Sequence, residues 1–416
     1  MENKPLKGVR VVDLSTFVAM PQCGRILAML GADVIKIEPV TPEFFRAGGK
    51  ALDPDIPCTE EENPAYLNVN AGKRMIAVDL KTEKGQQILH RLLESAAVFI
   101  SNMRHETLGK LGADYETLRE KYPSLVYGHI DAYGMKGPEA ARPSFDSQAY
   151  LARGGFMLDL NEPGSRPNEQ VVGCGDSAVG LAVSGAVLAA LVRRGKTGEG
   201  GYVNSSLLNA AIWAGGMQSI LTQYGIEFPR SRLNPPASAL STTYECKDGN
   251  WVCFVVSADT VGDWKQLCRA LKREDLANDP RFDDPVKQKV NAPEAVREID
   301  PLIKALTYEE LREELSKTNL AYERPRHMLE VLKDPQAMEN GYFIKKNYPS
   351  GKTVSFATPA FVMEGLEQEN LERTIHHGEH TKEVLLELGY SESEIEELVS
   401  GRIICLSDEA REVVGK

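Results

Sequence analysis

The chain has 416 residues, of which 42% are hydrophobic and 26% charged, and 60 Asp and Glu against 48 Lys and Arg give a formal net charge of -12 at pH 7. This composition predicts a folded protein of two or more domains. Its acidic balance argues against nucleic acid or an anionic membrane as the main partner, since both require a basic face, and no uninterrupted apolar run approaches the ~20 residues that span a bilayer.

Strand and helix signals alternate through the N-terminal part of the chain. We expect helices at residues 21–30, 83–96, 105–111 and 115–121, and strands at residues 9–14, 34–37, 75–80, 98–100 and 125–130. Strands that alternate with helices predict right-handed crossovers and a parallel sheet. The fold class is therefore α/β with an open Rossmann-like sheet, and ligand chemistry is expected at the carboxyl ends of the strands.

The alternation of strand and helix signals ends at about residue 154. A long helix of small residues follows Gly173 and ends at Arg194-Gly195, and we expect a second helix at residues 205–224. Prolines 229, 235 and 236 suggest a linker, and TTYECKDGNWVCFVV predicts a hairpin that turns at Asp248-Gly249. We therefore predict a large α/β domain from residues 1–226, an inserted small α+β domain at 227–333, and a return of residues 334–416 to the large domain.

The segment GCGDSAVG, at the start of the small-residue helix, is the most informative stretch. Gly173 and Gly175 permit a tight loop, and Asp176 falls where the helix begins. The helix N-terminus is expected to keep this carboxylate ionised and exposed. Two interpretations remain open from residue types alone: Asp176 is a helix cap, or it is a nucleophile that attacks an activated acyl group.

Several familiar motifs are absent. The sequence contains no GxGxxG after a strand, no GxxxxGK[ST], no GxSxG and no HExxH. The histidine cluster His376, His377 and His380 has no further ligands near it in the sequence, so no metal is expected. The seven cysteines form no CxxC pair, and the N-terminus enters a strand without a secretory leader. We therefore expect reduced thiols and a cytoplasmic location.

The order of motifs resembles that of the class III coenzyme A transferases, which include the formyl-CoA and carnitine CoA-transferases. The matching segments include GVRVVDLSTFVAMPQCGRILAMLGADVIKIEP, NAGKRMIAVDLKTEKGQQIL, GCGDSAVG, TGEGGYVNSSLLNA and GEHTKEVLLELGYS. The resemblance implies that Asp176 is the catalytic carboxylate. It would form an aspartyl–acyl anhydride and then an aspartyl-CoA thioester, with coenzyme A as a substrate and no permanently bound cofactor.

The resemblance also implies binding residues. Those expected to hold coenzyme A are Val18, Ala19, Arg74, Lys81, Asn102, Arg104 and Lys110, although each cation taken singly is as well explained as a solvated surface charge. Those expected to line the substrate pocket are Phe17, Met20, Tyr133 and Phe145, with ordinary core packing as the alternative. Pro39 and Asp131 replace an arginine and a lysine that contact coenzyme A in formyl-CoA transferase, so those two contacts are not expected.

Two alternatives and a substrate class follow from the same resemblance. The related α-methylacyl-CoA racemases have a histidine where this chain has Phe145, which cannot carry a proton. A non-catalytic CoA-binding relative is the other alternative. The ARGG run at residues 152–155 and the ECKDG hairpin resemble the branch that acts on (R)-2-hydroxy acids such as phenyllactate and 2-hydroxyisocaproate, in amino-acid fermentation. Members of the family form interlocked homodimers, and we expect the same here.

Overall fold

The computed structural model describes residues 4–47, 55–57, 59, 61–162, 164–168, 172–226, 238–366, 371 and 375–407. The chain divides into two compact units. The large unit comprises Met1–Phe156, Glu169–Met217 and Pro335–Lys416, and the small unit comprises Met157–Asn168 and Gln218–Asp334. The predicted proline-rich linker lies outside the described residues, and the domain boundaries at 226/227 and 333/334 stay a prediction.

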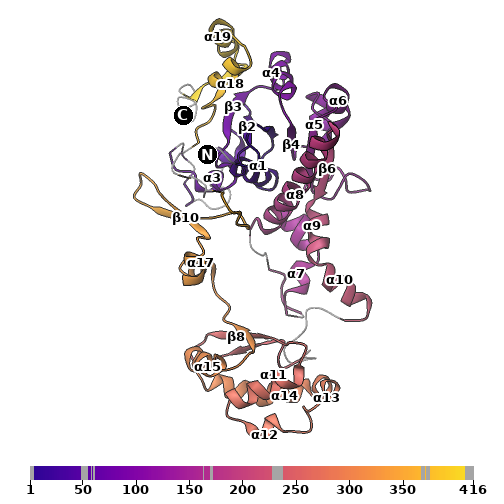
Figure 1. Ribbon diagram of the computed structural model, residues 1–416, viewed down its shortest axis with the longest axis vertical. Coiled ribbons are helices and arrows are strands. Elements are labelled where there is room, and N and C mark those ends of the chain that lie inside the picture. Colours follow the sequence, from indigo (N-terminus) through magenta and orange to yellow (C-terminus); the bar gives the residue numbers. More distant parts are fainter. Residues whose placement is uncertain are drawn as a thin grey trace. The chain divides into compact units, whose positions relative to one another are not determined.

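A seven-stranded sheet forms the centre of the large unit as described (Figure 1). Its order is β12-β3-β2-β1-β4-β5-β6, and every neighbouring pair is parallel except β12 with β3. The bounds are β1 (Arg10–Leu14), β2 (Asp33–Glu38), β3 (Arg74–Val78), β4 (Val98–Ser101), β5 (Val126–Asp131), β6 (Gly201–Ser206) and β12 (Ile404–Cys405). The order 3-2-1-4-5-6 is that of a Rossmann-type sheet, and its direction of winding reverses between β1 and β4.

The predicted helix at residues 205–224 is corrected by the structure. Residues Gly201–Ser206 form β6, which pairs in parallel with β5, and α9 (Leu207–Ala214) and α10 (Gly216–Gln223) follow. Apart from Tyr202 and Val203, β6 consists of glycine, asparagine and serine, which give only a weak local strand signal. The strand exists because β5 offers it a row of backbone partners, which is a long-range effect.

Helices cover both faces of the sheet. One face carries alternate apolar positions such as Val12, Ile35 and Phe99 in one buried cluster. The helices that contribute to this cluster are α4 (Glu83–Glu94), α5 (His105–Lys110), α6 (Tyr115–Lys121), α18 (Thr381–Glu387) and α19 (Glu392–Ser400). The opposite face carries α1 (Ala19–Met29) and α8 (Cys174–Thr197), which contact each other and the strands.

The small unit contains an antiparallel sheet in the order β7-β8-β9. The hairpin predicted around Asp248-Gly249 is confirmed, since Thr243 of β7 pairs with Cys253 of β8. Trp264, fully buried, packs against Phe282 within the apolar core. The elements are β7 (Thr243–Glu245), β8 (Trp251–Val255), α11 (Thr260–Ala270), α12 (Glu274–Ala277), α13 (Pro285–Val290), α14 (Ala292–Lys304), α15 (Tyr308–Leu315) and β9 (Ala321–Glu323).

Shorter elements complete the chain. They are α2 (Phe44–Ala47), α3 (Pro64–Asn70), the π-helix η2 (Ser147–Ala152), α7 (Phe156–Asp159), α16 (Met328–Val331), α17 (Pro335–Glu339), β10 (Phe343–Asn347) and β11 (Thr353–Ala357). The antiparallel pair β10–β11 packs beside α3, where Phe356 and Tyr66 belong to one apolar cluster. The C-terminal part of the chain thus returns to the large unit and shares its core.

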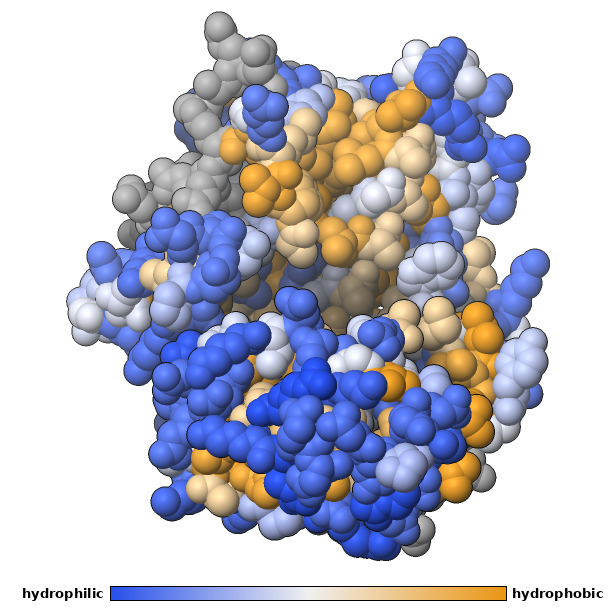
Figure 2. Space-filling model, turned by 60° about the horizontal axis from the view of Figure 1, so that its bottom comes forward, coloured by the Kyte–Doolittle hydropathy of each residue, from blue (hydrophilic) through white to orange (hydrophobic). Residues whose placement is uncertain are grey.

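Helix α8 combines an unusual composition with an exposed apolar side. It has 24 residues and is long and apolar enough, by length and composition only, to cross a membrane, a property that core helices of folded proteins share. It packs on β5 and β6. Its Leu181 and Val192 are nevertheless exposed, as are Ile212 and Trp213 of α9. Figure 2 shows a broad apolar area on one face of the molecule.

Candidate active site

The loop between β1 and α1 lies at the point where the winding of the sheet reverses. Asn102, just after β4, holds this loop with both ends of its amide: Thr16 N–H donates to Asn102 Oδ1 at 3.0 Å, and Asn102 Nδ2 donates to the Thr16 carbonyl at 2.8 Å. The next residue, Phe17, has φ of +61°, a left-handed conformation that a bulky side chain rarely adopts. Such strain is maintained only where the surroundings fix it, which is frequent at functional sites.

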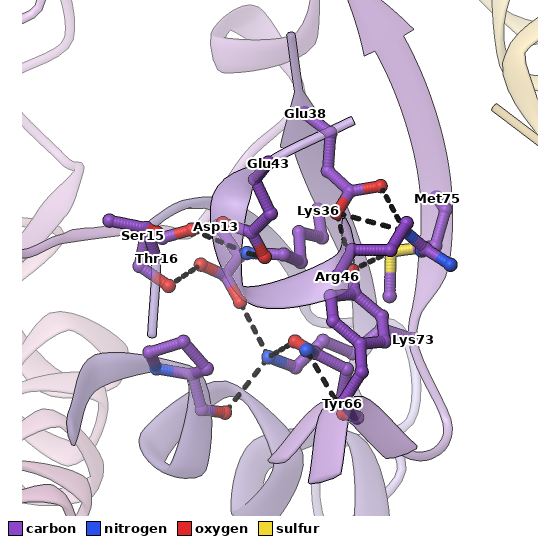
Figure 3. Close-up of polar contacts among 12 residues, drawn as sticks. Asp13, Ser15, Thr16, Lys36, Glu38, Glu43, Arg46, Tyr66, Lys73 and Met75 are labelled. Atoms are coloured by element: carbon purple, nitrogen blue, oxygen red, sulfur yellow. Dashed lines mark hydrogen bonds and ion pairs between the residues drawn. The ribbon is translucent and has the colours of Figure 1, made fainter. Parts of the chain in front are cut away.

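A buried network of charges supports this loop from the sheet side (Figure 3). Lys73 Nζ donates to Asp13 Oδ2, to the Pro21 carbonyl and to Asn70 Oδ1, each at 2.8 Å. Lys36 donates to the Ser15 carbonyl. Burial raises the pKa of Asp13, but Lys73 and Lys36 outweigh it and the pKa is lowered. The carboxylate is therefore ionised, and the network joins the end of β1 to the first turn of α1.

The first turns of α1 and α8 lie side by side. A Cβ at Gly180 of α8 would overlap the Ala19 carbonyl, so the absence of a side chain there allows the close approach. Gln22 Nε2 donates to Ser177 Oγ at 3.0 Å. A Cβ on Gly173, the left-handed residue that precedes α8, would contact Val18. These contacts place the β1–α1 loop, with Val18 and Ala19, next to the turn that carries Asp176.

A second carboxylate, Asp146, is buried beside the start of α8. Gly175 N–H donates to Asp146 Oδ2 at 3.3 Å. A side chain at Gly175 would overlap both Asp146 and Tyr150, so this glycine is required for the contact. Asp146 ends the loop that precedes η2, and π-helical turns are frequent at functional sites. Asp146 has no predicted role from the sequence. Its position directly after Phe145, a predicted pocket residue, is the feature that could have indicated one.

The environment of Asp176 corrects the expectation that it is ionised and exposed. The residue is only partly exposed, and burial, followed by the negative charge of Asp146, raises its pKa to about 7. The helix N-terminus favours the anion, but it does not outweigh these two effects. At neutral pH the carboxyl group therefore exists in both protonation states, as an acid–base or nucleophilic group near its working point does.

Aromatic side chains gather around Phe17. The ring of Phe145 lies edge-on to it with centroids 5.3 Å apart, and those of Phe45 and Phe44 lie at 6.0 and 6.2 Å. Phe44 and Phe145 are exposed. Tyr133 adjoins this group, because its hydroxyl donates to Ser144 Oγ at 3.0 Å. The predicted pocket residues Phe17 and Phe145 are thus in contact, and they form an apolar surface close to Asp146.

Three predicted site residues are placed elsewhere. Met20 is fully buried and belongs to the core. Arg74 lies at the amino end of β3, where it pairs with Asp33 at 2.7 Å and Glu387 at 2.6 Å, so it stabilises the opposite edge of the sheet. Lys110, at the end of α5, forms an exposed ion pair with Glu106. The directions of β3 and α5 determine where Arg74 and Lys110 lie, and similarity of sequence segments does not show these directions.

Other predicted residues remain at the carboxyl edge of the sheet. Lys81 is exposed just after β3, and Arg104 is exposed at the start of α5. Asn102 positions the β1–α1 loop through its amide, as described above. Among the residues that the structure describes, the carboxyl edge thus combines a strained loop, a carboxyl group of raised pKa, an apolar surface and exposed cations.

The chain is similar to known proteins over nearly its whole length. The model of CoA-transferase family III matches residues 6–381. The chain is 36% identical over 402 residues to the (R)-2-hydroxy-4-methylpentanoate CoA-transferase of Clostridioides difficile, with 96% of this chain and 99% of the relative covered. It is 36% identical over 417 residues to the cinnamoyl-CoA:phenyllactate CoA-transferase of Clostridium sporogenes, with 98% and 100% covered. A CAIB/BAIF family protein from Brucella suis has a similar structure, with a TM-score of 0.77, 29% identity, and 93% and 100% of the chains covered.

Proposed function

Because the chain belongs to CoA-transferase family III, we propose that it transfers coenzyme A from an acyl-CoA donor to a 2-hydroxy acid and that Asp176 carries the acyl group. One observation carries the proposal: a partly buried carboxyl group with a pKa of about 7 lies at the start of α8, beside the loop of Val18 and Ala19. Two curated relatives that are 36% identical are named for 2-hydroxy acids, which supports this acceptor class.

The proposed reaction has four balanced steps. Ionised Asp176 attacks the carbonyl of the donor thioester and the C–S bond breaks. CoA thiolate departs, and an aspartyl–acyl anhydride is formed. The thiolate attacks the aspartyl carbonyl, which forms an aspartyl-CoA thioester and releases the donor acid. The acceptor carboxylate then attacks the carbonyl of this thioester and expels the thiolate, which forms a second anhydride between Asp176 and the acceptor. The thiolate finally attacks the acceptor carbonyl, which forms the new acyl-CoA and regenerates the Asp176 carboxylate.

Burial and Asp146 favour the covalent stages of this sequence. Both raise the free energy of the ionised carboxylate, as the raised pKa of Asp176 indicates. When Asp176 is acylated its negative charge passes to the leaving thiolate, so the repulsion from Asp146 disappears. The same environment that makes the anion less stable therefore makes the anhydride and the thioester easier to reach.

We assign the remaining contacts as follows. The backbone N–H groups of Val18 and Ala19 would stabilise the tetrahedral oxyanions, because their loop adjoins the start of α8 and is fixed by Asn102. The exposed Lys81 and Arg104 would contact the phosphates of coenzyme A. The aromatic group around Phe17 would receive the apolar part of the acceptor acid.

The exposed apolar residues of α8 and α9 support a homodimer. Leu181, Val192, Ile212 and Trp213 are exposed, and contiguous exposed apolar areas mark protein interfaces. A dimer that covers this side, a cytoplasmic location and a role in fermentation all remain part of the proposal. Racemisation is disfavoured, because the apolar Phe145 stands at the position of the required base.

Trapping of the covalent intermediate tests the proposal. The enzyme is incubated with cinnamoyl-CoA in the absence of an acceptor and treated with hydroxylamine, and its peptides are mapped by mass spectrometry. We expect a hydroxamate on the peptide that contains Asp176, and D176N should show none and should lose at least about 10³-fold in transfer rate. Unmodified Asp176 in an active enzyme would exclude the covalent mechanism.

An acceptor panel tests the substrate class separately. (R)-Phenyllactate and (R)-2-hydroxyisocaproate should accept coenzyme A, and succinate, oxalate and formate should not. Exchange restricted to the small acids would contradict the 2-hydroxy acid assignment and leave the covalent mechanism intact. Absence of transfer to every acid, with CoA binding retained, would favour the non-catalytic alternative.

A further inference from the structure

The carboxyl end of β5 carries a group of side chains with no role in the proposed transfer. His129 and Asp131 lie two positions apart on this strand and therefore on one side of it, and His105 begins α5. One nitrogen or oxygen atom from each residue lies within 4.8 Å of the others. The closest pairs are His105 Nε2 to Asp131 Oδ1 at 3.0 Å and His129 Nδ1 to Asp131 Oδ2 at 3.5 Å.

His129 presents a buried ring nitrogen to the carboxylate of Asp131. Its side chain is 1% exposed, and Nε2 lies 2.8 Å from the Met103 carbonyl, to which only an N–H can donate. In the neutral ring Nδ1 then carries a lone pair. This atom has no hydrogen-bond partner among the described residues, and it faces a carboxylate oxygen. Two polar atoms in this arrangement require a positive partner between them, which is either a proton or a metal ion.

The supporting contacts are those that orient metal ligands. Ligating histidines commonly donate their second N–H to a carbonyl, as His129 does to Met103. Asn204 Nδ2 of β6 donates to Asp131 Oδ2 at 2.8 Å, which fixes the carboxylate. Ligand atoms at about 2.0–2.1 Å from a tetrahedral Zn²⁺ ion lie roughly 3.3 Å from each other. His105 Nε2 lies 3.0 Å from Asp131 Oδ1 and His129 Nδ1 lies 3.5 Å from Asp131 Oδ2. Although these distances involve different carboxylate oxygens, both are of the size expected between ligands of one ion.

We propose that His105, His129 and Asp131 bind one divalent transition-metal ion, with Zn²⁺ as the best match. Two imidazole nitrogens and one carboxylate oxygen form a donor set that selects such ions over Mg²⁺ or Ca²⁺. The side chain of His105 is 45% exposed, so the fourth position opens to solvent. The ion would hold the β4–α5 connection in place, because Met103 contacts His129 and the adjacent Asn102 holds the β1–α1 loop.

Metal binding can be measured independently of any transfer activity. The full-length protein is treated with a chelator, dialysed, and titrated with Zn²⁺ by calorimetry, and with Co²⁺ by visible absorption. We expect one equivalent of tight binding per chain and the d–d bands of four-coordinate Co²⁺ without a thiolate charge-transfer band, since the proposed ligands include no cysteine. H105Q and D131N should each lower the affinity at least about tenfold.

Controls distinguish this site from adventitious binding. H105Q should fold normally because His105 is exposed, and its circular dichroism spectrum should match that of the native chain. H327Q removes an exposed histidine of the small unit and should leave the affinity unchanged. Equal affinity in the native protein, H105Q and D131N, or a thiolate band that persists in all three, would overturn the assignment.

Discussion

Two regions of the large unit contain carboxyl groups that are shielded from solvent, and their surroundings shift the pKa values in opposite directions. Behind the β1–α1 loop, Asp13 is fully buried beside Lys73 and Lys36, and its pKa is lowered. At the start of α8, Asp176 lies beside another carboxylate, Asp146, and its pKa is raised to about 7. The first arrangement compensates the charge, and the second does not.

This difference in charge compensation corresponds to two roles, a structural one for the Asp13 region and a reactive one for the Asp176 region. A compensated ion pair holds parts of the fold in register, as Lys73 does by linking β1 to the first turn of α1. An uncompensated carboxylate gains stability when it loses its charge, either to a proton or to an acyl group. The rigid region and the reactive region adjoin, because the β1–α1 loop contacts the turn that carries Asp176.

The largest expected effect comes from breaking the compensated pair. K73M removes the cation that pairs directly with the buried Asp13 and leaves only the more distant Lys36. Removal of one partner from a buried ion pair typically destabilises a protein by about 3–5 kcal/mol. Chemical denaturation at pH 7.5 should show this loss in the large unit. The double variant D13N/K73M should recover part of it, because the buried carboxylate that lost its partner is then neutral, and Lys36 keeps its pair with Glu43. Equal stability of K73M and the native chain would remove the distinction between the two regions.

An intermediate effect is expected from the reactive pair. D146N removes the like charge but keeps an oxygen that accepts from Gly175, so the pKa of Asp176 should fall from about 7. Asp176 must be ionised to attack, and transfer therefore declines as pH falls through this pKa. In D146N the acid limb of the kcat/KM profile should move to lower pH by about one unit.

A matched control uses another acid of the same region. Glu139 is paired with Arg142 at 2.7 Å and has no contact with Asp176 among the described interactions. In E139Q the acid limb of the kcat/KM profile should stay at the same pH as in the native enzyme. An acid limb that stays at the native position in D146N would mean that burial alone sets the pKa of Asp176.

Much of this arrangement follows from sequence, and the exceptions share a cause. The alternation of strands and helices predicts the parallel sheet, and GCGDSAVG places Asp176 at a helix start. Local pattern does not predict β6, whose strand depends on pairing with β5. It also does not predict the neighbours of Asp176, because Asp146 reaches α8 from a separate segment. The pairing of Arg74 with Asp33 likewise depends on the end of β3 that it occupies, which a local pattern does not show.

The last effect, a shift in melting temperature, compares the two regions most directly. Asp176 has a folded-state pKa of about 7 against an ordinary value of 3.8, so the folded state binds its proton more tightly than the unfolded state does. Stability from this proton is fully present below about pH 4 and is lost as pH rises through about 7. D176N, which is always neutral, should therefore melt a few degrees above the native chain at pH 8 and at nearly the same temperature near pH 4. Thermal denaturation at both pH values measures the difference, and it should have the opposite sign to that of K73M at pH 8. A lower melting temperature of D176N at pH 8 would show that the anion is stabilised by partners, as Asp13 is, and the contrast between the two regions would fail.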